Sequence, residues 1–172
     1  LCLPAMAQRD FQLTQQRNPW LTASNAAALT TYADSTIAHA TISYRHDGGK
    51  LHTMSEGKRQ ETYDADVQSY YRLSSDIVAY GRATYSRHNI SEATGSMLMP
   101  TMKLMPFDLV EADNNVGDKS METFSINGAI GWKAWRCLAI GAQLNYTAGT
   151  YAKQRDLRHS NTLMDINAGL DA

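Results

Sequence analysis

Hydrophobic and polar residues alternate along six segments of the chain, at the two-residue spacing that sends successive side chains to opposite faces of a β-strand. The segments cover residues 36–45, 62–72, 77–86, 123–132, 138–147 and 164–170. In the fourth segment, for example, Phe124 and Ile126 fall on one face and Ser125 falls on the other. The pattern predicts an all-β protein with antiparallel strands.

The length of these segments and the positions of their aromatic residues favour strands that cross a membrane. Most segments are about ten residues long, longer than the usual ~5 to 6 residues of globular strands and close to the ~9 to 11 that span a bilayer. Aromatic residues fall near segment ends, where outer-membrane barrels carry girdles at the lipid headgroups. We expect the lipid-facing and girdle positions to be Tyr44, Tyr63, Tyr71, Tyr85, Phe124, Ile130, Trp132, Leu144 and Tyr146.

The opposite face of the predicted strands is polar. Its ionised and amide side chains are too numerous for the dry interior of a β-sandwich, and they suit a water-filled lumen. The candidate lumen-facing residues are Asp64, Asp66, Gln68, Arg72, Arg82, Gln143 and Asn145. The sequence leaves open whether they line an open pore or form ion pairs that plug a narrow lumen.

The connections between the predicted strands alternate between long and short, as they do in outer-membrane barrels with short periplasmic turns and longer external loops. We expect residues 88–120 to form a long external loop and residues 150–160 to form another. Residues 8–34 are then a periplasmic N-terminal segment, in which Asn25 is a candidate N-cap for a short helix over residues 25–32.

Six strands are fewer than the eight that the smallest barrels of this class need. We therefore expect residues 35–172 to form part of an antiparallel transmembrane β-barrel. One alternative is a complete eight-stranded barrel with further strands in residues 88–120, although Pro100 and Pro106 oppose strand formation there. A soluble secreted β-sandwich also has alternating faces and remains a third possibility.

Composition excludes two other classes of protein. The chain has 172 residues, of which 43% are hydrophobic and 19% charged, with a formal net charge of -1. This near-neutral balance provides no basic stripe, so we expect no nucleic-acid partner. No run approaches the ~18 to 20 apolar residues of a membrane-spanning helix, which excludes a helical membrane protein.

The first residues have the pattern of an export signal. An apolar start is followed by Ala5-Met6-Ala7, which fits the A-x-A pattern of a signal-peptide cleavage site. We expect residues 1–7 to be a signal-peptide remnant and the protein to reside in the outer membrane of a Gram-negative bacterium. Cys137 is then the one cysteine of the mature chain, so no internal disulfide can form.

Motifs for catalysis and metal binding are weak. The five histidines lack the paired spacing of a zinc site, and the acidic stretch 108–118 lacks the spacing of a calcium loop. The methionine-rich stretch 97–105 offers soft ligands for copper or silver, but thioethers more often fill gaps where a loop packs. We expect no enzyme activity, no catalytic residues, no metal site and no cofactor.

The start of the mature chain contains the motifs Arg17-Asn18-Pro19-Trp20-Leu21 and Asn25-Ala26-Ala27-Ala28-Leu29. With the long Tyr-rich strands that follow, the chain resembles a family of Bacteroidota outer-membrane β-barrel proteins without an assigned molecular activity. The resemblance implies a barrel of which this chain is the N-terminal third to half, and it implies no catalytic residues. Similar openings occur in barrels that look like fatty-acid transporters and secretion-system shuttle barrels. This chain departs from their usual Ala-Gly-Leu by having Ala28 before Leu29.

The sequence thus predicts an outer-membrane β-barrel that acts as a pore or transporter for an unidentified solute. An alternative is a non-enzymatic envelope scaffold or surface-binding barrel. The expected partners are outer-membrane lipid and, at the external loop, an envelope protein.

Overall fold

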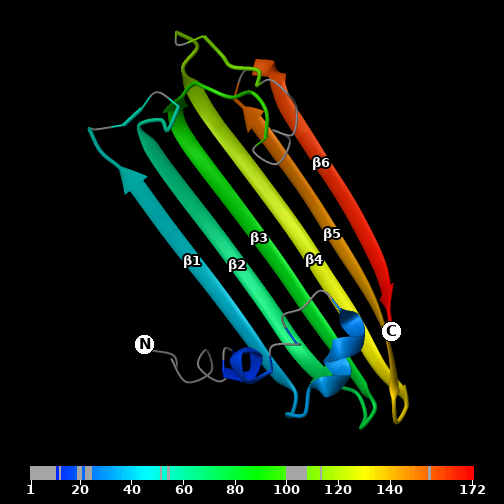
Figure 1. The fold of residues 1–172 in the computed structure, drawn as a ribbon. Coiled ribbons are helices and arrows are strands. Elements are labelled where there is room, and N and C mark those ends of the chain that lie inside the picture. The colour runs from blue at the N-terminus through cyan, green and yellow to red at the C-terminus, as the bar shows by residue number, and fades with distance from the viewer. Residues whose placement is uncertain are drawn as a thin grey trace.

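Six long strands form one antiparallel sheet in the order β1-β2-β3-β4-β5-β6 (Figure 1). The computed structural model describes residues 11, 13–18, 21, 25–50, 52–53, 55–99, 108–112, 114–154 and 156–172. The strands are β1 (Ile37–Gly48), β2 (Arg59–Arg72), β3 (Ile77–Ala93), β4 (Gly117–Trp135), β5 (Leu138–Lys153) and β6 (Asp156–Asp171). The predicted all-β antiparallel class is confirmed. The proposed signal-peptide remnant, residues 1–7, lies outside the described residues.

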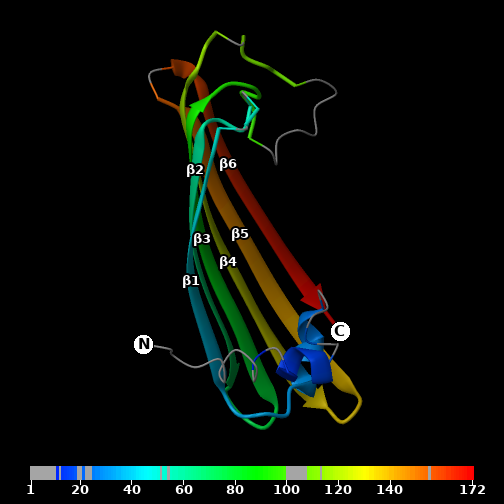
Figure 2. The same ribbon diagram turned by 90° about the vertical axis from the view of Figure 1, so that its left-hand side faces the viewer.

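The sheet is a single curved layer that is not closed, with β1 and β6 at its edges (Figures 1 and 2). At one end, which we call the turn end, residues 73–76 join β2 to β3 and residues 136–137 join β4 to β5. The opposite end, the loop end, carries the other three connections. Consecutive strands therefore alternate in direction between these two ends.

The strands extend further toward the loop end than the sequence predicted. The predicted external loop 88–120 is too long, because β3 continues to Ala93 and β4 begins at Gly117. The predicted long connection 150–160 is wrong, since β5 and β6 keep pairing until only residues 154–155 separate them. These extensions were not predicted because the strands there no longer alternate between apolar and polar residues, whereas backbone pairing needs no apolar face.

Strand alternation gives the sheet two chemically different faces. The pairing register places Phe124, Tyr85 and Ala65 side by side on one face, which we call the apolar face. Ser125 and Thr84 fall on the other, the polar face. Figure 2 shows the sheet edge-on. The N-terminal helical residues and the described part of the loop after β3 lie on the same side of it.

The N-terminal segment packs on the polar face at the turn end. Its 3-10 helix η2 (Ala26–Thr31) begins after Asn25, whose side chain accepts a hydrogen bond from the Ala27 N–H, as predicted for this N-cap. The helix contacts β3, β4, β5 and β6. A hydrophobic cluster joins this segment to β2 and β3 and consists of Phe11, Leu21, Leu29, Tyr32, Tyr70 and Val78. Within the described part of the chain, no helix is long and apolar enough to cross a membrane.

Candidate functional site

The polar face carries hydrogen-bonding side chains in register across all six strands. One row perpendicular to the strands takes one residue from each and consists of His39, Gln68, Arg82, Asn127, Asn145 and Asn167. The next row toward the loop end consists of Thr41, Asp66, Thr84, Ser125, Thr147 and Asp165. All seven candidate lumen residues from the sequence lie on this face, so strand pairing collects them into one surface.

Asp66 and Arg82 form the central ion pair of this surface. Arg82 Nη2 lies 2.6 Å from Asp66 Oδ2, and Arg82 Nε donates to the same oxygen at 2.7 Å. The two residues stand on neighbouring strands, one row apart in the register. The Arg82 side chain is 45% exposed and the Asp66 side chain 23%, so the pair is reachable from solvent and its charges act on whatever contacts this face.

Asp64 and Gln68, which flank Asp66 on β2, also bond to neighbouring strands. Asp64 Oδ1 accepts a hydrogen bond from the Ser86 hydroxyl at 2.6 Å, and Gln68 Oε1 accepts one from the Tyr80 hydroxyl at 3.4 Å. The polar side chains of β2 are thus held in place by β3.

Asn145 and Gln143 lie beside the N-terminal segment. Asn127 Nδ2 donates to Asn145 Oδ1 at 2.9 Å, which links β4 to β5. Both candidate amides line a small cavity of about 90 Å³ between the sheet and η2, together with Leu21 and Leu29. This cavity has room for a few water molecules at most.

Arg72 lies apart from the other candidates. It is at the turn end, where its Nη2 donates to the backbone carbonyl of Tyr32. Arg72 therefore anchors the N-terminal segment to β2. The sequence offered no signal for this contact, because it depends on how residues 11–32 fold back over the sheet.

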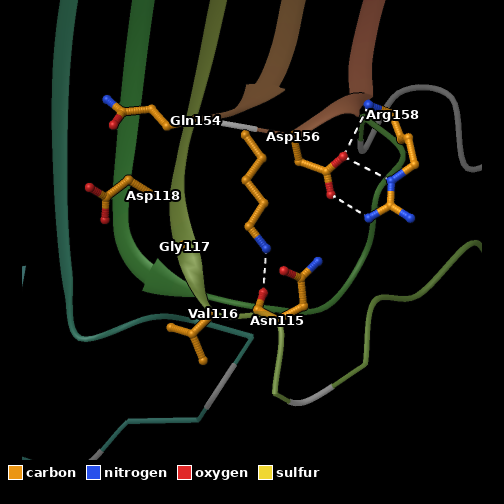
Figure 3. A pocket seen from close by; sticks show the side chains of 8 residues that line it. Asn115, Val116, Gly117, Asp118, Gln154, Asp156 and Arg158 are labelled. Carbon is orange, nitrogen blue, oxygen red and sulfur yellow. Dashed lines mark hydrogen bonds and ion pairs between the residues drawn. The ribbon is translucent and has the colours of Figure 1, made fainter.

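A second polar cavity of about 470 Å³ lies at the loop end (Figure 3). Its lining residues are Asn115, Val116, Gly117, Asp118, Lys153, Gln154, Asp156 and Arg158. The Arg158 guanidinium donates two hydrogen bonds of 3.0 Å each to the Asp156 carboxylate (Figure 3). The Lys153 ammonium donates to the backbone carbonyl of Asn115. Both interactions fix the rim of this cavity.

Behind this rim lies a buried ionic cluster centred on Glu111, which the sequence analysis missed. Lys153 Nζ lies 2.9 Å and Lys119 Nζ 3.4 Å from Glu111 Oε2, while His159 Nδ1 lies 2.9 Å from Oε1. All four side chains are at most 3% exposed. The cluster fastens the segment after β3 to β4, β5 and β6 at once, a convergence that sequence spacing does not reveal.

Burial alone would raise the pKa of the Glu111 carboxyl. The hydrogen bonds from Lys153 and His159 and the charge of Lys119 outweigh it, so the pKa lies below its ordinary value of 4.5. Glu111 is therefore ionised at neutral pH, as its two lysine partners require.

The apolar face carries every predicted lipid-facing and girdle residue. Six of the nine are more than 40% exposed, and Tyr85 and Phe124 are each 39% exposed. Tyr146 on β5 is half-buried. The register therefore separates the two predicted sets of residues onto opposite faces.

Other candidate chemistry stays dispersed. Of the methionine-rich stretch, Met99 is buried against the sheet near Gly149, and residues 100–105 lie outside the described residues. Among the residues that the structure describes, no group of three His, Cys, Asp or Glu side chains could hold a metal ion.

Comparison with known families shows which family the chain belongs to. Residues 26–171 match a protein family of unknown function, DUF6850. The chain belongs to this family. The match begins at η2 and runs through β6, so it covers the sheet and the helix that packs on it. Comparison with curated proteins and with solved structures finds no match.

Proposed function

We propose that the sheet is part of a membrane-spanning β-barrel in the outer membrane of a Gram-negative bacterium, and that it serves the passage of a solute. The apolar face contacts lipid and the polar face lines the interior. One observation carries this proposal, namely an exposed, uncharged band that crosses all six strands.

The band is bounded toward the loop end by a polar row. In that row Arg87 and Glu122 form an ion pair of 3.2 Å on neighbouring strands. From the next row, marked by Tyr85, to the row of Ile77 and Trp132, the apolar face carries no Asp, Glu, Lys, Arg or His. Charge thus stops abruptly at one level of the sheet.

The height of the band fits a bilayer. Tyr85 and Ile77, in the outermost rows of the band, are eight residues apart on β3 (85 minus 77), or about 26 Å of strand at about 3.3 Å per residue. A strand tilt of about 40° shortens this to about 20 Å, and the charged row of Arg87 follows at about 25 Å, which is the height of the apolar band in outer-membrane barrels. The aromatic residues at its margins then lie at the headgroups.

The same face argues against a soluble β-sandwich. Ile42 is 88% exposed, Leu170 84% and Met164 68%, and no described segment covers them. Soluble monomers seldom expose more than a few hundred Å² of contiguous apolar surface. An exposed apolar band of this kind is suited to contact with lipid.

Passage of solute is supported by the polar face, whose central charges are partly exposed. We predict that reversing one charge, by Asp66→Lys or Arg82→Glu, changes the ratio of cation to anion permeability several-fold in planar-bilayer recordings, because charge near the conduction path attracts counter-ions. Reversing both together should restore much of the original selectivity. Unchanged conductance and selectivity in all three variants would contradict a conducting role for this face.

A surface-binding barrel is the second candidate function. It is favoured by the loop end, where cavities of about 470 and 490 Å³ open beside the fastened segment 108–116. Under this alternative the Asp66 and Arg82 variants leave conductance unchanged, and changes at Arg158 weaken partner binding.

A further inference from the structure

We infer that the described residues of the N-terminal segment, residues 11, 13–18, 21 and 25–32, form an internal plug that closes the turn end of the proposed barrel and must undock before solute passes. This inference rests on the proposed function, since a plug has meaning only if the polar face lines an interior. It follows from how closely the segment and the sheet fit each other.

Directly beneath η2 the sheet carries two glycines. Gly131 and Gly141 are paired in register on the polar face of β4 and β5. A Cβ atom on Gly141 would lie 2.8 Å from the Ala26 Cβ, and one on Gly131 would lie 2.8 Å from the Ala26 carbonyl oxygen. Any side chain at either position would push η2 off the sheet.

Glycines on the other face show that this fit is local. Gly128 of β4 lies on the apolar face, and a Cβ atom there would meet nothing within 4 Å. Gly81 of β3 is equally open. Only glycine leaves enough space for η2 at positions 131 and 141, whereas a larger residue would fit at the two glycine positions of the apolar face.

Aromatic side chains hold the segment at its other side. The Tyr70 ring of β2 stacks with both Phe11 and Tyr32, with centroid distances of 5.4 and 5.1 Å and interplanar angles of 25° and 21°. Tyr80 of β3 extends the group at 4.9 Å from Tyr70. Phe11, Tyr32 and Tyr70 are each 1% exposed, so the contact excludes water.

Polar contacts connect the segment to two well-separated strands, β2 and β6. Ala26 N–H donates to Asp171 Oδ2 of β6 at 2.7 Å, and Arg72 of β2 donates to the Tyr32 carbonyl. The segment thus spans the polar face from β2 to β6. A solute moving along this face meets the segment directly, and the contacts that hold its described residues on the sheet are non-covalent and reversible.

The test compares two glycine variants of the full-length protein. Gly141→Val fills the space under η2, and Gly128→Val adds the same group on the open face. We expect Gly141→Val to raise the open probability in planar bilayers by about tenfold, equivalent to about 1.4 kcal/mol of lost docking free energy. Gly128→Val should leave the open probability unchanged.

Hydrogen exchange of the backbone amides in residues 26–32 shows whether the segment has undocked. The inference is supported if Gly141→Val loses this protection and conducts more. It is overturned if protection is lost while conductance stays at the wild-type level, or if both variants conduct alike. Should Gly141→Val fail to assemble, Asp171→Ala replaces it, because it removes the Ala26 acceptor without adding volume.

Membrane insertion is measured first, by heat-modifiable gel mobility of the wild-type protein. Absence of insertion refutes the proposed function, and the plug with it. Insertion combined with unchanged conductance on undocking refutes the plug alone.

Discussion

At the scale of single residues, the Glu111 cluster is the most consequential feature that the sequence did not reveal. Lys119, Lys153 and His159 each belong to a different strand, and only pairing brings them to one carboxylate. The predicted lumen residues were simpler to find, because the two-residue period alone assigns a face. Contacts made by loops follow no such period.

Removal of the Glu111 charge should release the loop. Glu111→Gln leaves two buried lysines without their counter-charge, so we expect a loss of about 3 to 5 kcal/mol in the free energy that holds residues 108–116 against the sheet. The matched control is Glu122→Gln, which breaks the half-exposed pair with Arg87 and should cost at most about 1 kcal/mol. Hydrogen exchange of residues 108–116 measures both.

The pH dependence of the same readout follows from the direction of the Glu111 shift. A carboxyl whose folded pKa lies below 4.5 contributes stability above that pH and loses it as the pH falls through the folded value. Wild-type protection of the loop should therefore fall below pH 4.5, and this dependence should flatten in Glu111→Gln. If residues 108–116 were equally protected in the wild-type protein and in Glu111→Gln at neutral pH, the cluster would not be what fastens this segment.

At the scale of elements, the strands were predictable where an apolar face constrains them. In residues 77–86 and 123–132 every second position is uncharged, because these positions lie in the uncharged band. Beyond the band, β3 and β4 continue as hydrogen-bonded strands with polar side chains on both faces. Their extension to Ala93 and from Gly117 therefore left no periodic trace.

A new charge should destabilise the protein much more on the apolar face of a strand than on the polar face. Ile130→Arg places a guanidinium inside the band, one row from the Trp132 margin, and should cost up to ~2 to 4 kcal/mol of folding free energy in a bilayer. Asp165→Arg, on the polar face of β6 and exposed, should cost far less. Urea unfolding in phosphatidylcholine vesicles measures both, and equal costs would argue against lipid contact at Ile130.

At the scale of the whole molecule, the sequence predicted one polar and one apolar face but not that the chain would cover its own polar face. The N-terminal segment does so at the turn end, through Tyr32, Tyr70 and η2. This covering could not be anticipated, because Gly131 and Gly141 look like ordinary weak positions in a strand until η2 is seen against them. The result is a sheet with its apolar face exposed and its polar face partly covered.

The most direct test of a membrane-spanning sheet is fractionation of the native cell envelope, combined with heat-modifiable gel mobility and protease treatment of intact cells. We predict recovery in the outer membrane, a mobility shift on heating, and cleavage confined to the loop end, within residues 94–116. A soluble product without a mobility shift would contradict the account.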